Sequence, residues 1–300
     1  MTPARSTAPA PAGVPEVDEP GAPPDAALAP PAVLAKARRE NFPVALRFLP
    51  HELRTRLETI YGFARLVDDA GDEATSDRNA LLDWLEADLH RAFAGEAQHP
   101  LLRRVTTLVR DLDATPDPFL RLLEANRLDQ RVARYETWEE LAHYCTLSAN
   151  PVGELVLASL GMATPERVRA SDEVCTALQL AEHLQDVGED LGRGRIYLPQ
   201  EDLDAFGVAE HDLRAQTPSP SVRRLLAFEC DRGRSLLASG VPLVASLHGP
   251  GRVAVAAYVG GGRAAFDAVQ RSGYDVLRRS PAAGKLARLR ATAAVLREAS

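Results

Sequence analysis

Two groups of carboxylates at helical spacing carry the clearest chemical signal in this sequence. Asp68 and Asp72 lie four residues apart in a segment with helical periodicity, and Asp69 between them is a further candidate metal ligand. Residues four apart project from nearly the same side of an α-helix, where two like charges repel. This repulsion indicates a bound cation, and oxygen ligands without His or Cys beside them favour magnesium over zinc. A solvated acidic helix end would explain this first acidic motif equally well by itself.

The second acidic motif is Gln179, Glu182, Asp186 and Asp190, spaced three, four and four residues apart. These residues form one polar stripe with leucines on both sides, which indicates a cavity wall rather than a solvated helix face. Two Asp-x-x-x-Asp pairs on separate helices could face one another and hold two or three magnesium ions. A diphosphate would bridge those ions, because magnesium usually combines few carboxylates with phosphate oxygens. An ordinary charged helix is the alternative.

Basic residues lie beside both motifs. Arg65 precedes Asp68 by three residues, and Arg195 and Tyr197 follow the second motif in a loop. A guanidinium group is a planar fork that matches phosphate oxygens. Each Arg alone would be a surface ion-pair partner, but their position next to both acidic motifs favours contact with a diphosphate.

The elements that must position these residues are helices. Apolar residues recur at spacings of three and four after residue 32, and no segment alternates as a strand would. Ser76 is the predicted N-cap of the second helix, Thr137 caps another, and Pro151 should kink or split the helix that contains it. The predicted helices are 50–73, 76–95, 99–112, 118–132, 137–161, 165–191, 219–239, 250–272 and 284–297.

Composition limits the remaining possibilities. Residues 1–32 contain nine prolines, nine alanines and no aromatic residue, so we expect a disordered tail followed by one domain over 33–300. A net charge of −7 gives no electrostatic basis for nucleic-acid binding, and no apolar run is long enough to span a membrane. The three cysteines are far apart, which argues against a zinc site or disulfides and fits buried thiols in the cytoplasm.

The motifs resemble those of the squalene and phytoene synthase family. The most specific matches are 61–73 (YGFARLVDDAGDE) and 184–200 (LQDVGEDLGRGRIYLPQ), and the resemblance extends from about residue 40 to about residue 281. It implies a single-domain isoprenoid synthase fold, a helical bundle around a central cavity, with magnesium-bound diphosphate. In this family an Asn usually lies four residues before the first Asp of the second motif, whereas this chain has Glu182. The role of that position therefore stays open.

Within the family, the segments 40–45 (ENFPVA) and 144–153 (YCTLSANPVG) are similar to the hydroxysqualene synthase (HpnC-type) branch of bacterial hopanoid synthesis. That resemblance implies conversion of presqualene diphosphate to hydroxysqualene without NADPH. It also implies functional pairing with presqualene diphosphate synthase and a squalene-forming reductase. Phe42 and Tyr61 are candidates for stabilising a carbocation through their rings, and both could equally be core residues.

Two alternatives remain at this stage. One is head-to-head condensation of two farnesyl diphosphates to presqualene diphosphate or dehydrosqualene, or a phytoene synthase-type reaction. The other is a helical scaffold without catalytic activity. An apolar C30 product leads us to expect transient membrane contact by a cytoplasmic, peripheral enzyme, although no basic amphipathic helix stands out in the sequence.

Overall fold

The structure, a computed structural model, describes Val33 and residues 49–300. Every regular element in that part of the chain is a helix and no β-strand occurs there, which confirms the predicted all-α fold. The predicted tail, 1–32, and the candidate residue Phe42 lie outside the described residues.

The helices follow one another with short connections. Those of the first half are α2 (His51–Asp72), α3 (Arg78–Ala94), α4 (Pro100–Leu112), α5 (Asp117–Asp129), α6 (Trp138–Ser148) and α7 (Asn150–Ser159). Those of the second half are α8 (Pro165–Gln185), α9 (Val187–Gly192), α10 (Gln200–Ala205), the 3-10 helix η3 (Glu210–Arg214), α11 (Pro220–Leu237), α12 (Gly240–Ser246), α13 (Gly249–Arg271) and α14 (Lys285–Glu298). The predicted long helices are all present. The short elements α10, η3 and α12 were not predicted, because periodicity needs a longer window to show.

A side-chain N-cap begins five of the described helices, α3, α4, α6, α8 and α11. The Thr137 side chain accepts a hydrogen bond from the Glu140 amide at 3.2 Å, as predicted. The prediction of Ser76 as an N-cap is wrong by one residue, because the neighbouring Asp77 has the extended backbone and its carboxylate accepts from the Ala80 amide at 3.1 Å.

Pro151 splits its helix, as predicted. The break falls at Ala149, which separates α6 from α7, and Pro151 then occupies the first turn of α7. Proline is tolerated there because its missing N–H would have no partner within the helix.

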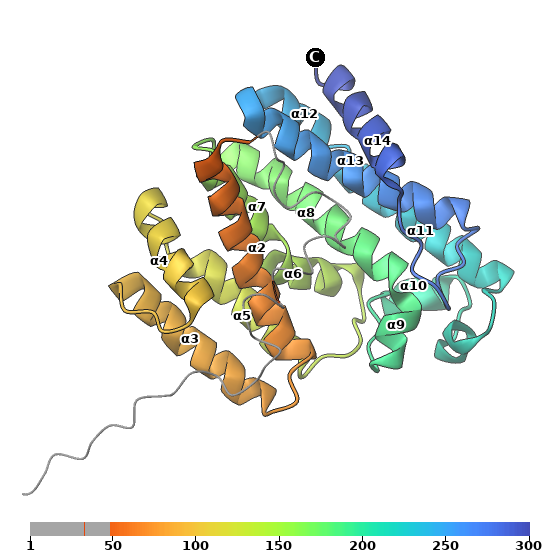
Figure 1. Cartoon of the computed structure of the whole chain (residues 1–300). Helices are drawn as coiled ribbons and strands as arrows, with labels where there is room; N and C mark the ends of the chain where they lie inside the picture. The colour runs from red at the N-terminus through yellow and green to blue at the C-terminus, as the bar shows by residue number, and fades with distance from the viewer. Residues whose placement is uncertain (1–32, 34–48) are drawn as a thin grey trace, which may run out of the picture.

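The helices enclose a space between α2 and α8. Helix α7 packs against both of them, and α13 packs along α8 and carries α14 on its outer side. Figure 1 shows α3 and α4 beyond α2 at one edge of the molecule and α14 at the opposite edge. One apolar core joins α2 to α3, α4 and α5, and another joins α8 to α11 and α13. The space between them is the candidate site.

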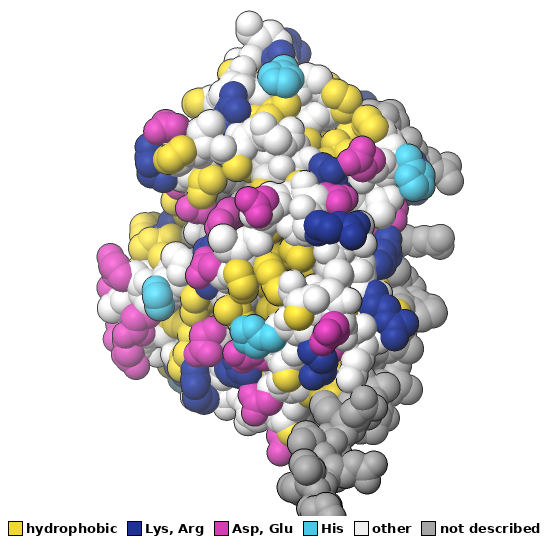
Figure 2. All heavy atoms as spheres, turned by 90° about the vertical axis from the view of Figure 1, so that its left-hand side faces the viewer, with side chains coloured by type: hydrophobic (Ala, Val, Ile, Leu, Met, Phe, Trp, Pro, Cys, Tyr) yellow, Lys and Arg dark blue, Asp and Glu magenta, His cyan; other side chains and the backbone are white. Residues whose placement is uncertain are grey.

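The glycine run Gly260, Gly261 and Gly262 permits close helix packing. A Cβ on Gly260 would lie 2.5 Å from the Thr292 amide of α14, and a Cβ on Gly262 would lie 2.7 Å from the Leu178 side chain of α8. No helix in the described part of the chain is long and apolar enough to cross a bilayer. On the face in Figure 2, acidic, basic and apolar side chains are intermixed.

Candidate active site

Two adjoining cavities lie between α2 and α8. One is apolar, with a volume of ≈ 1230 Å³ including its mouth, and the other is polar, with a volume of ≈ 790 Å³ on the same measure. They meet at five residues that line both: Arg65, Asp68, Ser148, Gln179 and Glu182. A ligand with a charged head and a long apolar tail would fit this division.

The structure brings both acidic motifs to the polar cavity. Asp68 and Asp72 reach it from α2, Glu182 from α8 and Asp190 from α9, and Asp186 reaches it from the break between those two helices. Gln179 lines it as well, together with Arg65, Arg195 and Tyr197 from the predicted set. Residues more than 100 positions apart in the sequence therefore surround one volume, which is the arrangement needed for a shared ligand.

The sequence predicted one continuous helix over 165–191, but the helix that carries the second motif is broken. Asp186 has φ −106° and ψ 15°, and it separates α8 from α9. The break accompanies a close contact, since a Cβ on Gly188 would lie 2.1 Å from the carbonyl oxygen of Leu277. The Asp190 amide still donates to the Asp186 carbonyl at 2.8 Å, so the two carboxylates keep helical spacing across the break.

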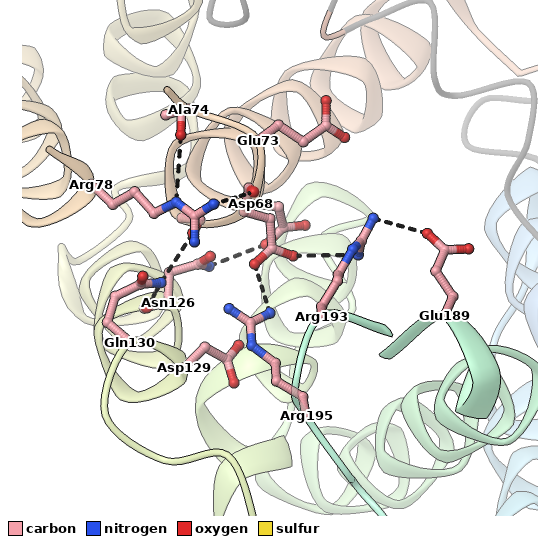
Figure 3. A network of polar contacts seen from close by, with 12 residues as sticks. Asp68, Glu73, Ala74, Arg78, Asn126, Asp129, Gln130, Glu189, Arg193 and Arg195 are labelled. Atoms are coloured by element: carbon pink, nitrogen blue, oxygen red, sulfur yellow. Dashed lines mark hydrogen bonds and ion pairs between the residues drawn. The ribbon is translucent and has the colours of Figure 1, made fainter. Parts of the chain in front are cut away.

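The loop after α9 returns to the first motif. Arg195 Nη1 lies 2.6 Å from Asp72 Oδ1, and the more exposed Arg193 lies 3.9 Å from the other oxygen of the same carboxylate. Arg193 also pairs with Glu189 at 2.8 Å. Figure 3 shows both arginines pointing from this loop toward the end of α2. Arg195 thus ties the loop after the second motif to the first motif and places a guanidinium group on the wall of the polar cavity.

Helix α5 packs against α2 and contacts the first motif through a hydrogen bond. Asn126 donates to Asp68 Oδ1 at 3.1 Å (Figure 3), and a Cβ on Gly71 would lie 2.3 Å from Asn126 Oδ1. Glycine at position 71 therefore lets α5 approach α2 closely enough for this hydrogen bond. Asn126 was not predicted as a site residue. A polar residue four positions after Leu122, on an otherwise apolar helix face, was the feature of the sequence that could have indicated it.

A carboxylate with two tyrosine partners forms another wall of the polar cavity. Asp129 accepts hydrogen bonds from the hydroxyls of Tyr144 at 2.7 Å and Tyr197 at 3.0 Å. The His183 ring stacks on Tyr197 with centroids 3.8 Å apart. Burial raises the pKa of Asp129 to about 6 and lowers the pKa of His183 to about 3. Asp129, Tyr144 and His183 were not predicted as site residues, because nothing in the sequence shows that α5, α6 and α8 meet.

Asp69 is the predicted ligand that the structure places elsewhere. Its side chain is 0% exposed and pairs with Arg65 Nε at 2.9 Å, and it does not line either cavity. Arg65 is also bonded to Glu73 at 3.0 Å, so its guanidinium is held by its own helix at the junction of the two cavities.

The apolar cavity is lined mainly by aliphatic side chains of α2, α7, α8, α12 and α13. Tyr61 and Tyr258 contribute aromatic rings, and Cys175 contributes a thiol whose pKa burial raises to about 12. The predicted burial of the cysteines holds for Cys145 and Cys230, whereas Cys175 is only partly buried because it faces this cavity.

The charge balance of the polar cavity favours a cation. Six carboxylates line it, against the two guanidinium groups of Arg65 and Arg195. Burial raises the pKa of Asp68 to about 7 and, together with repulsion from Asp186, that of Asp190 to about 7. No group of three or more His, Cys, Asp or Glu side chains in the described part of the chain is arranged to hold an ion unaided. The donors are hard oxygens, which suit magnesium completed by oxygens of a bound ligand.

Comparison with known proteins agrees with this geometry. The family model for squalene/phytoene synthase matches residues 35–289. A hydroxysqualene synthase of Rhodopseudomonas palustris is 38% identical over 70% of this chain and 72% of its own length. A 15-cis-phytoene synthase of Synechococcus elongatus is 32% identical over 80% of this chain and 82% of its own. The crystal structure of the squalene synthase HpnC from Alicyclobacillus acidocaldarius superposes with a TM-score of 0.71, at 43% identity, over 81% of this chain and 95% of that one. A chain with this fold, these paired motifs and these relatives belongs to the squalene/phytoene synthase family and is an enzyme of isoprenoid synthesis.

Proposed function

We propose that the protein converts presqualene diphosphate and water to hydroxysqualene and diphosphate with the help of magnesium. The observation that carries this proposal is the junction of an apolar cavity with a polar one lined by both acidic motifs. A C30 chain would occupy the apolar cavity, and its diphosphate would lie between α2 and α9. The bond between carbon and the diphosphate oxygen breaks, water then adds to the cation, and the adduct loses a proton to give the alcohol.

The main role of the polar cavity would be to stabilise the negative charge that develops on the leaving diphosphate. Magnesium, when bound, would neutralise the negative charge that develops on the diphosphate, and Asp68, Asp72, Asp186 and Asp190 would hold it. Arg195 and Arg65 would contact the diphosphate oxygens. Glu182 stands where relatives usually carry Asn and lines both cavities, so it adds one carboxylate at the boundary between head and tail.

The hydrocarbon walls would control what reaches the cation. Aliphatic side chains exclude bulk water, and Tyr61 on α2 would present its ring to the positive charge. Asp129 holds the hydroxyls of Tyr144 and Tyr197 at the cavity surface. Each hydroxyl donates its one proton to Asp129, so its oxygen could accept a hydrogen bond from a water molecule. The expectation that NADPH is not used follows from the resemblance to the hydroxysqualene branch.

The comparisons support this reaction over its alternatives, since the relative named hydroxysqualene synthase has the higher identity. A second candidate is condensation of two allylic diphosphates, which the phytoene synthase relatives favour. In a pathway, a presqualene diphosphate synthase would supply the substrate and a reductase would convert hydroxysqualene to squalene. The three cysteines are free thiols, which supports a cytoplasmic location.

Product analysis tests the proposal. The purified full chain is incubated with presqualene diphosphate or with farnesyl diphosphate, with and without magnesium and NADPH, in water enriched in oxygen-18. We expect release of diphosphate only with magnesium, and hydroxysqualene that carries the heavy oxygen whether or not NADPH is present.

Other products would point elsewhere. Presqualene diphosphate or dehydrosqualene from farnesyl diphosphate would support the condensation reaction, and squalene formed only with NADPH would contradict water capture. Absence of any magnesium-dependent diphosphate release from either substrate would overturn the whole proposal.

A further inference from the structure

Helix α14 exposes apolar side chains among basic ones. Leu286 is 61% exposed and Leu289 is 67% exposed, and the only other large apolar side chain exposed in the described part of the chain is Phe228. Helical residues are about 100° apart, so Leu286, Leu289, Arg290, Ala293 and Arg297 fall within an arc of roughly 100°. We call these five residues the outer face of α14. All five are exposed.

The opposite face of α14 is also apolar, and Val295 on that face is fully buried. Both faces therefore carry aliphatic residues. This is why the sequence pattern did not mark 284–297 as a basic amphipathic helix. Only the packing of α14 on α13 shows which leucines remain outside.

The surrounding segment is strongly basic in an otherwise acidic chain. Residues 271–300 contain seven Lys or Arg residues and two acidic ones, whereas the whole chain carries −7. Of the two acidic residues, Glu298 is bound to Arg263 at 2.8 Å. Lys285, Arg290 and Arg297 form no ion pair with the described residues. Their charge is therefore directed to solvent. The face in Figure 2, by contrast, mixes both signs.

Helix α14 is held firmly against the enzyme body. The Thr292 backbone lies against Gly260 of α13, and Arg252 of α13 donates to the Ala299 carbonyl at 3.0 Å. Figure 1 shows α14 along the outer edge of the molecule beside α13. The apolar cavity extends to Leu243 of α12 and Val255 of α13, and α14 packs on both of these helices. The outer face is thus displayed rigidly, close to the hydrocarbon-binding end of the site.

We propose that the outer face of α14 docks onto the surface of an anionic lipid bilayer. The leucines would enter the boundary between headgroups and acyl chains, and the arginines and Lys285 would pair with lipid phosphates. The net positive charge of this segment is complementary to an anionic leaflet and opposite to that of the rest of the chain, which would orient the enzyme. The docking does not depend on which reaction the site performs.

Vesicle flotation tests the docking with the full chain and no substrate. Wild type is mixed with vesicles of phosphatidylglycerol and phosphatidylcholine in equal parts, or with vesicles of phosphatidylcholine alone, at low and high salt. We expect binding to the anionic vesicles that weakens with salt, and little binding to the neutral ones. The double variants Leu286→Ser/Leu289→Ser and Arg290→Glu/Arg297→Glu should each reduce the partition coefficient by about tenfold or more.

A matched control shows whether lost binding depends on the location of the substituted arginines or only on the net charge of the protein. Arg110→Glu/Arg131→Glu makes the same change in charge at two exposed arginines, one in α4 and one just after α5, and it should bind within about twofold of wild type. Thermal melts and diphosphate release should be unchanged in all three variants.

Equal binding by wild type and both α14 variants would overturn the proposal, as would wild type that does not float with anionic vesicles. A single-stranded RNA oligonucleotide serves as the competing polyanion. If it binds through α14 while vesicles do not, the face recognises nucleic acid and the bilayer assignment is wrong.

Discussion

Arg195 Nη1 lies 2.6 Å from Asp72 Oδ1, so the loop that leaves the second acidic motif is ion-paired to the end of the first. The Arg195 side chain is only 11% exposed, and nearby Asp129 adds a further negative charge. A mostly buried guanidinium between Asp72 and Asp129 is well placed to contact the proposed diphosphate. The ion pair between Arg195 and Asp72 therefore holds the two motifs together and places a cation in the proposed diphosphate site.

Replacement of Arg195 should weaken transition-state stabilisation. We expect Arg195→Gln to lower kcat/KM about 100-fold, roughly 2.7 kcal/mol, because a donor aimed at the leaving group is lost. Arg193→Gln is the matched control in the same loop, and its effect should be smaller because that side chain is more exposed and farther from Asp72. Steady-state diphosphate release measures both. Equal losses in the two variants would contradict a special role for Arg195.

The proposed metal-binding role of the acidic motifs can be tested at Asp190 of the short helix α9. Asp190→Asn should reduce turnover at least about 1000-fold and raise the magnesium concentration needed for half-maximal rate, because a hard oxygen ligand is lost. Asp68→Ala and Asp186→Ala should likewise abolish turnover while leaving the helical circular dichroism spectrum intact.

Glu189→Gln provides the control for these variants, since Glu189 neighbours Asp190 on α9 but does not line the polar cavity. It should retain most of the activity and the magnesium dependence of the wild type. Near-normal activity of Asp68→Ala or Asp186→Ala would rule out the two-motif arrangement.

Close packing of α9 positions the aspartates of the second motif. Two glycines of that helix allow a test, because the same Gly→Ala change can be made at a tightly packed position and at an open one. A Cβ on Gly188 would lie 2.1 Å from the Leu277 carbonyl oxygen, whereas nothing lies within 4 Å of a Cβ on Gly192. Gly188→Ala should therefore lower the free energy of unfolding by about 1–3 kcal/mol and reduce turnover by displacing Asp186 and Asp190. Gly192→Ala should do neither. Chemical denaturation and the diphosphate assay distinguish the two outcomes, and equal stability of both variants would refute this account of the α8–α9 break.

A buried ionic triad away from the site gives a pH-dependent prediction. Arg232 of α11 bonds Glu229 at 2.8 Å and Asp202 of α10 at 2.7 Å, and it lies 4.6 Å from the centre of the Trp138 ring. Two carboxylates thus share one guanidinium. Burial raises the pKa of Glu229 to about 8, although Arg232 opposes the shift.

The difference between the pKa of Glu229 in the folded and unfolded states determines how its contribution to the free energy of unfolding changes with pH. Since the folded-state pKa of Glu229 lies above the ordinary value of 4.5, the unfolded chain loses this proton first as pH rises. The contribution of Glu229 to the free energy of unfolding should therefore fall between about pH 5 and pH 8 and level off above that. Glu229→Gln should remove this part of the pH dependence, as measured by denaturation at several pH values. Arg232→Met should instead destabilise the fold by about 3–5 kcal/mol, because it leaves two buried carboxylates without their cation.

The sequence alone determined the helical class, most helix positions and the two acidic motifs. Apolar residues at spacings of three and four require a buried face, and carboxylates at spacings of three and four must share a side of a helix, so both conclusions follow from local geometry. The split at Pro151 was equally local, because proline restricts the backbone wherever it occurs.

Tertiary structure alone decided which side chains share a volume. Asp68 and Asp69 are neighbours of the same chemical type, yet Asp68 faces the cavity and Asp69 is buried against Arg65, because only one side of α2 faces α8 across the cavities. Asn126 joins the site where Gly71 lets α5 approach α2, and Asp129 lines the same cavity from the end of α5. The exposure of Leu286 and Leu289 likewise depends on which face of α14 packs on α13. Periodicity fixes the faces of a helix, but contacts between elements distant in sequence determine which face meets the ligand, the core or the solvent.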